Sequence, residues 1–139
     1  MALILVIDDE PKVRQMVRRI LVLAGHSVVE ADDGGGALSE MRREAPAVVL
    51  TDILMPGTEG IETIFKIRRA HPETGIIAMS GGGQAGELDL LKLAEGAGAD
   101  AVLAKPFRAA ELTAAVDRLL APQGNDPVPV YATISTAST

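Results

Sequence analysis

The sequence contains no cysteine and no tryptophan, and it has only two phenylalanines and one tyrosine. The lack of cysteine excludes disulfide bonds, thiolate metal sites and cysteine nucleophiles. The scarcity of aromatic residues leaves the core to aliphatic side chains, in a chain that is 47% hydrophobic. No apolar run approaches the roughly 18 residues of a membrane span, and residues 3–7 are too short a run for a secretory signal. We therefore expect a soluble, cytoplasmic protein with no membrane partner.

Basic residues are also in the minority, with 13 Lys and Arg against 19 Asp and Glu and a net charge of −6. A dedicated nucleic-acid binder should carry a basic face, so we expect no nucleic-acid partner. The length of 139 residues suits one domain. From residue 122 onward the chain has three prolines and no helical period. This pattern predicts a domain at 1–121 and a flexible tail at 122–139, although Val128–Ile134 would also suit a short edge strand or a partner contact.

Short apolar runs alternate with segments of helical period along the chain. The predicted strands are Leu3–Ile7, Ser27–Ala31, Ala47–Leu50, Ile76–Met79 and Ala101–Ala104. The predicted helices lie at Pro11–Ala24, about Gly36–Arg43, Glu87–Ala97 and Ala110–Leu120, with a further helix marked by Ile61, Ile64, Phe65 and Arg68 and ended by His71-Pro72. This repetition predicts an α/β fold, a doubly wound five-stranded parallel sheet with helices on both faces. The flavodoxin-like order 2-1-3-4-5 is favoured, because it gathers the ends of strands one, three and five around one crevice.

Charged residues stand at the ends of three of these strands. Asp8 and Asp9 follow the first strand, Asp52 follows the third, and Lys105-Pro106 follows the fifth. An acidic residue ahead of a helix is a common amino cap, which accounts for one of the first pair but not for both. Carboxylates brought together repel one another unless a cation joins them, and a lysine opposite them suits an anion. The pattern predicts a site for Mg²⁺ and a phosphoryl group, and a cis peptide bond before Pro106 would be in keeping with it.

Two loops add candidate residues to this site. The turn after Asp52 contains Pro56-Gly57 and could direct the Leu54 carbonyl toward the metal, and a carboxylate such as Asp52 can attack phosphorus. Ser80 precedes a run of glycines, where its hydroxyl could donate to a phosphoryl oxygen. Residues 81–86 also satisfy G-x-G-x-x-G, which is weak evidence for a dinucleotide because the acidic first loop would repel pyrophosphate.

Taken together, these motifs resemble the receiver domain of two-component response regulators over residues 3–121. The residues that carry the resemblance are Asp8-Asp9, the run from Asp52 to Gly57, Ser80-Gly81 and Lys105-Pro106-Phe107. The resemblance implies Asp52 as the phosphoacceptor, Lys105 as the partner of the phosphoryl group and Ser80 as the switch hydroxyl.

The resemblance also implies a set of Mg²⁺ ligands. Asp9 is expected to bind the ion directly and Asp8 through water, joined by the Asp52 carboxylate and the Leu54 carbonyl. The implied donor is a histidine kinase or a phosphotransfer protein, and the output is contact with a downstream protein or a phosphorelay. We expect a stand-alone receiver, monomeric or weakly dimeric, that catalyses only its own phosphorylation and dephosphorylation and is not an enzyme on an external substrate.

One residue departs from the family pattern. Receivers usually carry Tyr or Phe three positions before the lysine, and Val102 stands there in this chain. Valine has no ring to turn inward, so the usual coupling to output is in doubt while the phosphorylation chemistry is not. On the fourth predicted helix, Leu90, Leu93, Ala94 and Ala97 form one stripe, while Leu88 and Leu91 either pack under the glycine-rich loop or offer a partner patch.

Two other functions fit the sequence less well. A phosphatase of the haloacid-dehalogenase type would place Asp-x-Asp after its first strand, and Asp8-Asp9-Glu10 lacks that spacing. A receiver that signals without phosphate would not need the intact set of Asp9, Asp52, Ser80 and Lys105. The two histidines lie in helix-terminal turns away from the acidic crevice, so phosphohistidine chemistry within the chain is not expected.

Overall fold

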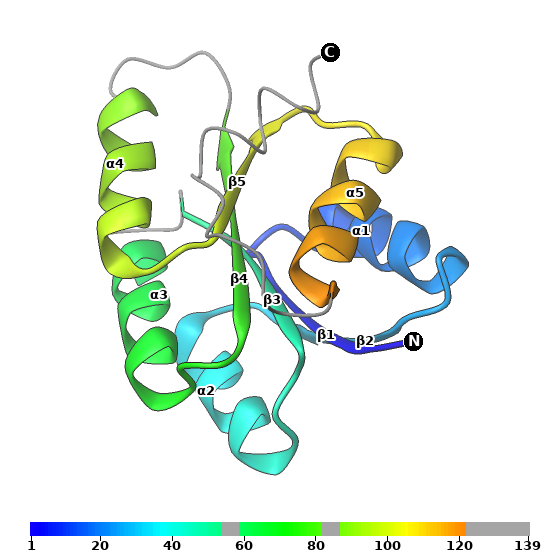
Figure 1. Cartoon of the computed structure of the whole chain (residues 1–139), viewed down its shortest axis with the longest axis horizontal. Coiled ribbons are helices and arrows are strands. Elements are labelled where there is room, and N and C mark those ends of the chain that lie inside the picture. Colours follow the sequence, from blue (N-terminus) through cyan, green and yellow to red (C-terminus); the bar gives the residue numbers. More distant parts are fainter. Residues whose placement is uncertain (54–58, 82–86, 122–139) are drawn as a thin grey trace.

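Five parallel strands form a single sheet in the order β2-β1-β3-β4-β5, as the sequence predicted (Figure 1). The computed structural model describes residues 1–53, 59–81 and 87–121, and the side chains of residues 59 and 87–91 fall outside this description. The strands are β1 (Leu3–Ile7), β2 (Ser27–Ala31), β3 (Val48–Asp52), β4 (Gly75–Gly81) and β5 (Ala101–Lys105). The helices are α1 (Pro11–Leu23), α2 (Gly34–Arg43), α3 (Glu59–Ala70), α4 (Glu87–Ala97) and α5 (Ala109–Leu120).

The helices divide into two layers, one on each face of the sheet (Figure 1). Helices α1 and α5 cover one face, where Val17 and Val116 pack against strand residues such as Val6 and Leu50. Helices α2, α3 and α4 cover the other face, where Met41, Ile64 and Ala94 belong to a second buried cluster. Because both faces are covered, the strands are apolar on both sides, which explains why they read as continuous apolar runs.

Three strands extend further than the apolar runs predicted. β3 reaches Asp52, β4 reaches Gly81 and β5 reaches Lys105. Their backbones remain paired to these ends, with Asp52 in register with Met79 and Gly81 in register with Lys105. Backbone pairing does not require an apolar side chain, so hydropathy alone ended these strands too early. The polar residues are therefore held within the sheet and not in the loops that follow it.

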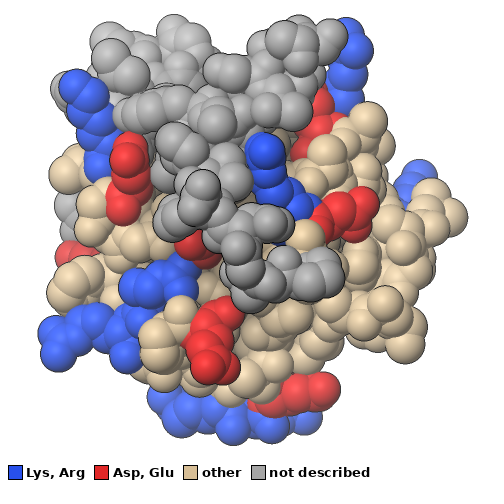
Figure 2. All heavy atoms as spheres, viewed as in Figure 1, with Lys and Arg blue, Asp and Glu red and all other residues tan. Residues whose placement is uncertain are grey.

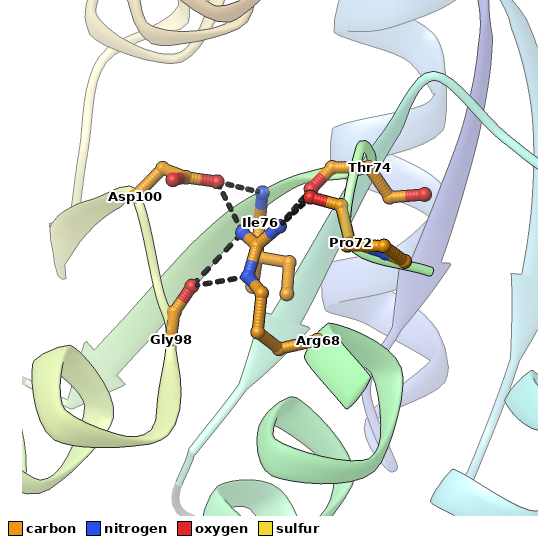
Figure 3. A network of polar contacts seen from close by, with 6 residues as sticks. All are labelled: Arg68, Pro72, Thr74, Ile76, Gly98 and Asp100. Carbon is orange, nitrogen blue, oxygen red and sulfur yellow. Dashed lines mark hydrogen bonds and ion pairs between the residues drawn. The ribbon is translucent and has the colours of Figure 1, made fainter. Parts of the chain in front are cut away.

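At the end of the sheet where β4 and β5 begin, the side chain of Arg68 on α3 connects several segments (Figure 3). Its guanidinium donates to the carbonyls of Gly98 at 2.9 and 3.1 Å, Pro72 at 2.8 Å and Thr74 at 2.9 Å. It also meets Asp100 Oδ2 at 2.6 Å, and that oxygen accepts the backbone N–H of Ile76 at 2.8 Å. The network connects α3 to the segments that precede β4 and β5.

Gly98 is required at its place in this network. Its φ of +121° lies in the left-handed region, and an added Cβ would stand 2.7 Å from Cγ of Arg68. Any other residue would therefore be strained and would displace the arginine.

Among the described residues, no helix is both long and apolar enough to cross a bilayer. The predicted tail at 122–139 lies outside the described residues.

Candidate functional site

The site lies at the carboxyl edge of the sheet, where β1, β3 and β5 end. In strands β3 and β5, side chains alternate between the two faces, so Asp52 shares a face with Leu50 and Lys105 shares one with Leu103. Both leucines belong to the cluster under α1 and α5. The long side chain of Lys105 reaches from β5 back across the end of β4 toward the carboxylates. The strand order therefore gathers at one point residues that are up to 97 positions apart in the sequence.

Asp8 is fully buried and is held from several directions. Its Oδ1 accepts the backbone N–H of Glu10 at 2.9 Å, and its Oδ2 lies 3.1 Å from Nζ of Lys105. Its own N–H donates to the carbonyl of Ala31 at 3.2 Å. The amino-cap interpretation was therefore wrong for Asp8, because Glu10 occupies the N-cap position of α1 without a side-chain cap bond and the Asp8 carboxylate instead joins the turn before the helix to the lysine.

Asp52 is buried at the end of β3, with 3% of its surface exposed. Its Oδ2 lies 3.3 Å from Nζ of Lys105, so one ammonium bridges two carboxylates that belong to different strands. The backbone around Asp52 is approached closely by Gly60 near the start of α3, where an added Cβ would lie 2.6 Å from Cα of Ile53. Glycine at that position lets α3 begin directly beside the site.

The environment of Lys105 favours its charged form. Burial by itself would lower the pKa of the ammonium, but the Asp52 carboxylate and the hydrogen bond and charge of Asp8 outweigh it and raise the pKa above its ordinary value of 10.5. The side chain is 21% exposed, so Lys105 is not sealed inside the fold as Asp8 is. The peptide bond between Lys105 and Pro106 is cis, as the sequence suggested.

Asp9 and Glu10 extend the acidic group to the surface. Carboxylate oxygens of Asp8, Asp9 and Glu10 lie within 4.8 Å of one another, and Asp9 and Glu10 are exposed. Hard oxygen donors of this kind, with room for water, suit Mg²⁺. Lys105 pairs with Asp8 and Asp52, while Asp9 and Glu10 add two more carboxylates beside Asp8, and this excess negative charge fits a bound divalent cation. Glu10 was not among the predicted site residues, because its proximity to the other oxygens depends on the fold of the turn.

Ser80 and Val102 occupy the neighbouring strands. Ser80 is fully buried near the end of β4 and is in register with Ala104, one residue before Lys105. Val102 is fully buried under α4, in the cluster that contains Ala94 and Ala99. The Leu54 carbonyl, predicted as a metal ligand, lies outside the described residues, as do the side chains of Leu88 and Leu91.

Sequence reasoning missed a second layer of support around Asp8. Arg14, one turn into α1, donates through Nη1 to the carbonyl of Asp8 and through Nε to Glu30 Oε1 at 3.2 Å. Arg18 donates to the other oxygen of Glu30 at 2.7 Å. Only the spacing of Arg14 and Arg18 by one helical turn could have indicated a shared partner. His26, which was expected to lie away from the acidic crevice, accepts the backbone N–H of Ala2 through Nδ1 at 3.2 Å.

A buried aspartate at the end of β3, a lysine that bridges two carboxylates and an acidic turn after β1, on a doubly wound parallel sheet, form the arrangement of a signalling receiver domain. Comparison with known families agrees with this geometry, since the model of the response regulator receiver domain matches residues 4–117. The chain therefore belongs to the response regulator receiver domain family. Members of this family are phosphoacceptor signalling domains of two-component systems and generally bind Mg²⁺ at an acidic pocket.

Curated relatives and solved structures include other receivers. The chain is 34% identical over 119 residues to the nitrogen assimilation regulatory protein NtrX of Azorhizobium caulinodans, covering 84% of this chain and 26% of that protein. It is 35% identical to the response regulator MprA of Mycobacterium leprae, covering 84% of this chain and 50% of MprA. The chain thus spans between about a quarter and a half of the length of these relatives.

Two solved structures are similar over nearly their whole length. The receiver domain of NtrX from Brucella abortus is 34% identical with a TM-score of 0.78, covering 84% of this chain and 97% of that one. The chemotaxis response regulator CheY4 of Vibrio cholerae is 30% identical with a TM-score of 0.75, covering 86% of this chain and 98% of that one. Both support the flavodoxin-like winding described above.

Proposed function

We propose that this receiver accepts a phosphoryl group on Asp52 from a histidine kinase or a phosphotransfer protein, in a reaction that depends on Mg²⁺. The observation that supports this most directly is the position of Lys105, whose Nζ lies 3.3 Å from Oδ2 of Asp52 and 3.1 Å from Oδ2 of Asp8. A buried carboxylate beside a fixed cation is arranged to attack an anionic phosphoryl group, because the cation offsets the repulsion between them.

In the proposed transfer, an Asp52 carboxylate oxygen forms a bond to phosphorus while the bond between phosphorus and the donor's imidazole nitrogen breaks. The released imidazole keeps the electron pair of that bond and takes a proton from solvent. The ammonium of Lys105 would then pair with two anions, the phosphoryl group and the carboxylate of Asp8. Mg²⁺, when bound by Asp8, Asp9 and Asp52, supplies further positive charge for the transferring group. The Leu54 carbonyl and the Ser80 hydroxyl retain their proposed roles as a metal ligand and a switch hydroxyl.

The output that we propose is contact with a downstream protein or transfer of the phosphoryl group along a relay. The receiver is proposed to act on its own in the cytoplasm, as a monomer or weak dimer, without turning over an external substrate. An antibody against the receiver should then detect a species of about 14.5 kDa in cells of the source organism. Detection of a longer species alone would replace the stand-alone part of the proposal with a covalently attached effector.

Labelling with acetyl phosphate tests the proposed chemistry. The wild-type chain should take up the radiolabelled phosphoryl group only when Mg²⁺ is present, and the label should be lost in alkali because an acyl phosphate hydrolyses there. Lys105→Ala should slow labelling, and Asp52→Asn should abolish it, whereas the matched control Asp117→Asn, at an exposed position on α5, should label normally. Uptake by Asp52→Asn at undiminished stoichiometry would remove Asp52 as the phosphoacceptor.

A further inference from the structure

Helices α3 and α4 pack side by side on the same face of the sheet (Figure 1). Residues of both helices line an apolar groove. The groove has a volume of about 460 Å³. Its apolar lining comes from Ile61 and Phe65 on α3 and from Leu93, Gly96 and Ala97 on α4. Phe65 is 49% exposed and Leu93 is 56% exposed, although both residues are large and apolar. Leu93 was predicted to share one stripe with the buried Ala94, and its exposure corrects that expectation.

The groove is open where Gly96 lies. A Cβ added to this residue would meet nothing within 4 Å, so a larger side chain could be accommodated there without displacing its neighbours. Protein interiors are normally filled to the density of an organic crystal, and a hollow with apolar walls leaves that surface to water. Single exposed apolar residues are ordinary, but two that flank one hollow form a surface suited to a partner.

Basic side chains stand on both sides of the groove. Lys66 lines it on α3 and Lys92 lines it on α4, and both are exposed. Arg69 adds a third positive charge, with its guanidinium 5.6 Å from the centre of the Phe65 ring. Glu62 is the acidic residue of the lining. The rim therefore carries a positive excess in a chain whose net charge is −6.

This local excess of positive charge favours a negatively charged binding partner in the groove. Figure 2 shows acidic and basic side chains interspersed over the visible face, so selection must come from the rim itself and not from a broad field. A second copy of the chain placed groove to groove would bring together two rims of the same net positive charge, which repel each other. An acidic partner would instead be attracted to the rim while its apolar residues fill the hollow.

The groove is connected at both ends to other parts of the fold. α3 follows β3, which ends at Asp52, and α4 follows β4, which contains Ser80. At the far end, Arg68 of α3 holds Gly98, which follows α4, by two hydrogen bonds of 2.9 and 3.1 Å (Figure 3). The two helices are thus joined at the far end by these hydrogen bonds.

We propose that the α3–α4 groove binds an amphipathic helix of a partner protein, with one or two large aliphatic or aromatic side chains in the hollow and glutamate or aspartate residues beside them. Apolar anchors spaced by one helical turn suit a groove between two helices, and acidic neighbours of those anchors meet Lys66 and Lys92. Binding itself does not depend on phosphorylation, and only its regulation through Asp52 would rest on the proposed function.

The experiment uses the full chain and a pair of fluorescent synthetic helical peptides. One peptide carries leucines at one-turn spacing with flanking glutamates, and the other has the same leucines with lysines in place of the glutamates. We expect saturable binding of the glutamate peptide by fluorescence polarisation, at least about tenfold tighter than that of the lysine peptide at low salt. Amide NMR shifts should concentrate at residues 61–66 and 92–97.

Two variants of the chain test the location of this binding. Gly96→Leu should fill the groove without harming the helix, since leucine favours a helix more than glycine does, and should abolish binding while the melting temperature is kept. The double change Lys66→Glu with Lys92→Glu should weaken binding of the glutamate peptide by about tenfold or more and should strengthen binding of the lysine peptide. Arg42→Glu, a charge reversal at an exposed position on α2, is the matched control and should bind like wild type.

Three results would overturn the proposal. The first is a lack of saturable binding of the glutamate peptide at millimolar concentration. The second is binding that survives in Gly96→Leu or that shifts amides on α1 and α5 instead. The third is a concentration-dependent dimer in sedimentation velocity that Gly96→Leu dissolves, which would assign the groove to a second copy of the chain. Labelling of Asp52 by acetyl phosphate is independent of each result, so failure here leaves the proposed function intact.

Discussion

At one edge of the sheet, the guanidinium of Arg68 contacts one carboxylate and three backbone carbonyls. At the other edge, the single ammonium of Lys105 pairs with the carboxylates of both Asp8 and Asp52. The first arrangement balances one positive charge against Asp100. The second leaves an excess of negative charge, because Asp9 and Glu10 adjoin Asp8. Groups that a fold leaves unbalanced in this way are typical of functional sites, where a ligand from solution completes them.

The edge around Arg68, where the positive charge is balanced by Asp100, should therefore contribute to the stability of the fold. Arg68→Ala removes five hydrogen bonds from backbone carbonyls and Asp100. We expect the free energy of unfolding to fall by about 2 kcal/mol, because hydrogen bonds to a charged group are among the stronger ones. Urea denaturation of both proteins measures this change. The neighbouring exposed Arg69→Ala is the control and should cost less than about 1 kcal/mol. Equal losses in the two variants would contradict the contrast between the edges.

At the carboxyl edge, where negative charge is in excess, binding of a cation should stabilise the fold. At ten times its dissociation constant, Mg²⁺ should raise the free energy of unfolding of the wild-type chain by about 1.4 kcal/mol. Asp9→Asn should remove most of this gain, and without metal it should raise stability by about 0.5 kcal/mol, because one of the repelling charges is lost.

Thermal unfolding with Mg²⁺ and with a chelator provides both measurements. Asp117→Asn, which neutralises an exposed carboxylate on α5, should respond to Mg²⁺ as the wild-type chain does. If Asp9→Asn retains the full response to Mg²⁺, Asp9 is not a ligand, and the excess charge at this edge needs another explanation.

The smallest expected effect concerns pH. The pKa of Lys105 is raised in the folded chain above its ordinary value of 10.5, so the folded state holds this proton more tightly than the unfolded state. The stability that results is fully present below about pH 10.5 and is lost as the pH rises through the folded pKa. Urea denaturation at increasing alkaline pH should show a steeper loss for wild type than for Lys105→Gln. Lys66→Gln, at an exposed position, should follow the wild-type curve. Parallel curves for all three proteins would exclude this contribution.

Much of the fold could be predicted from hydropathy and capping. The strands Leu3–Ile7 and Ser27–Ala31 and the helix Glu87–Ala97 have the bounds that the sequence indicated. The ends of β3, β4 and β5 could not be predicted, because the residues there are polar and only their pairing with neighbouring strands keeps them extended. α2 begins two residues earlier than predicted, after Asp33 accepts the N–H of Gly36 at 2.7 Å.

The contact between Asp8, Asp52 and Lys105 was predicted from strand order, since parallel strands present their carboxyl ends at one edge. The supporting contacts of Arg14 with Asp8 and Glu30 were not predicted, because the spacing of Arg14 and Arg18 indicates a shared partner but does not say which residue it is. The same is true of Arg68, whose partners Gly98 and Asp100 are 30 and 32 residues away. The roles of Ser80 and of the Leu54 carbonyl remain predictions.

The central claim is that the unbalanced carboxyl edge exists to phosphorylate Asp52. The most direct measurement treats the chain with acetyl phosphate and Mg²⁺, reduces it with borohydride and sequences its peptides by mass spectrometry, since reduction converts an acyl-phosphorylated aspartate to homoserine. The account predicts homoserine at position 52 alone, and none when Mg²⁺ is chelated. Homoserine at Asp8 or Asp9 with Asp52 unchanged, or at position 52 regardless of Mg²⁺, would contradict it.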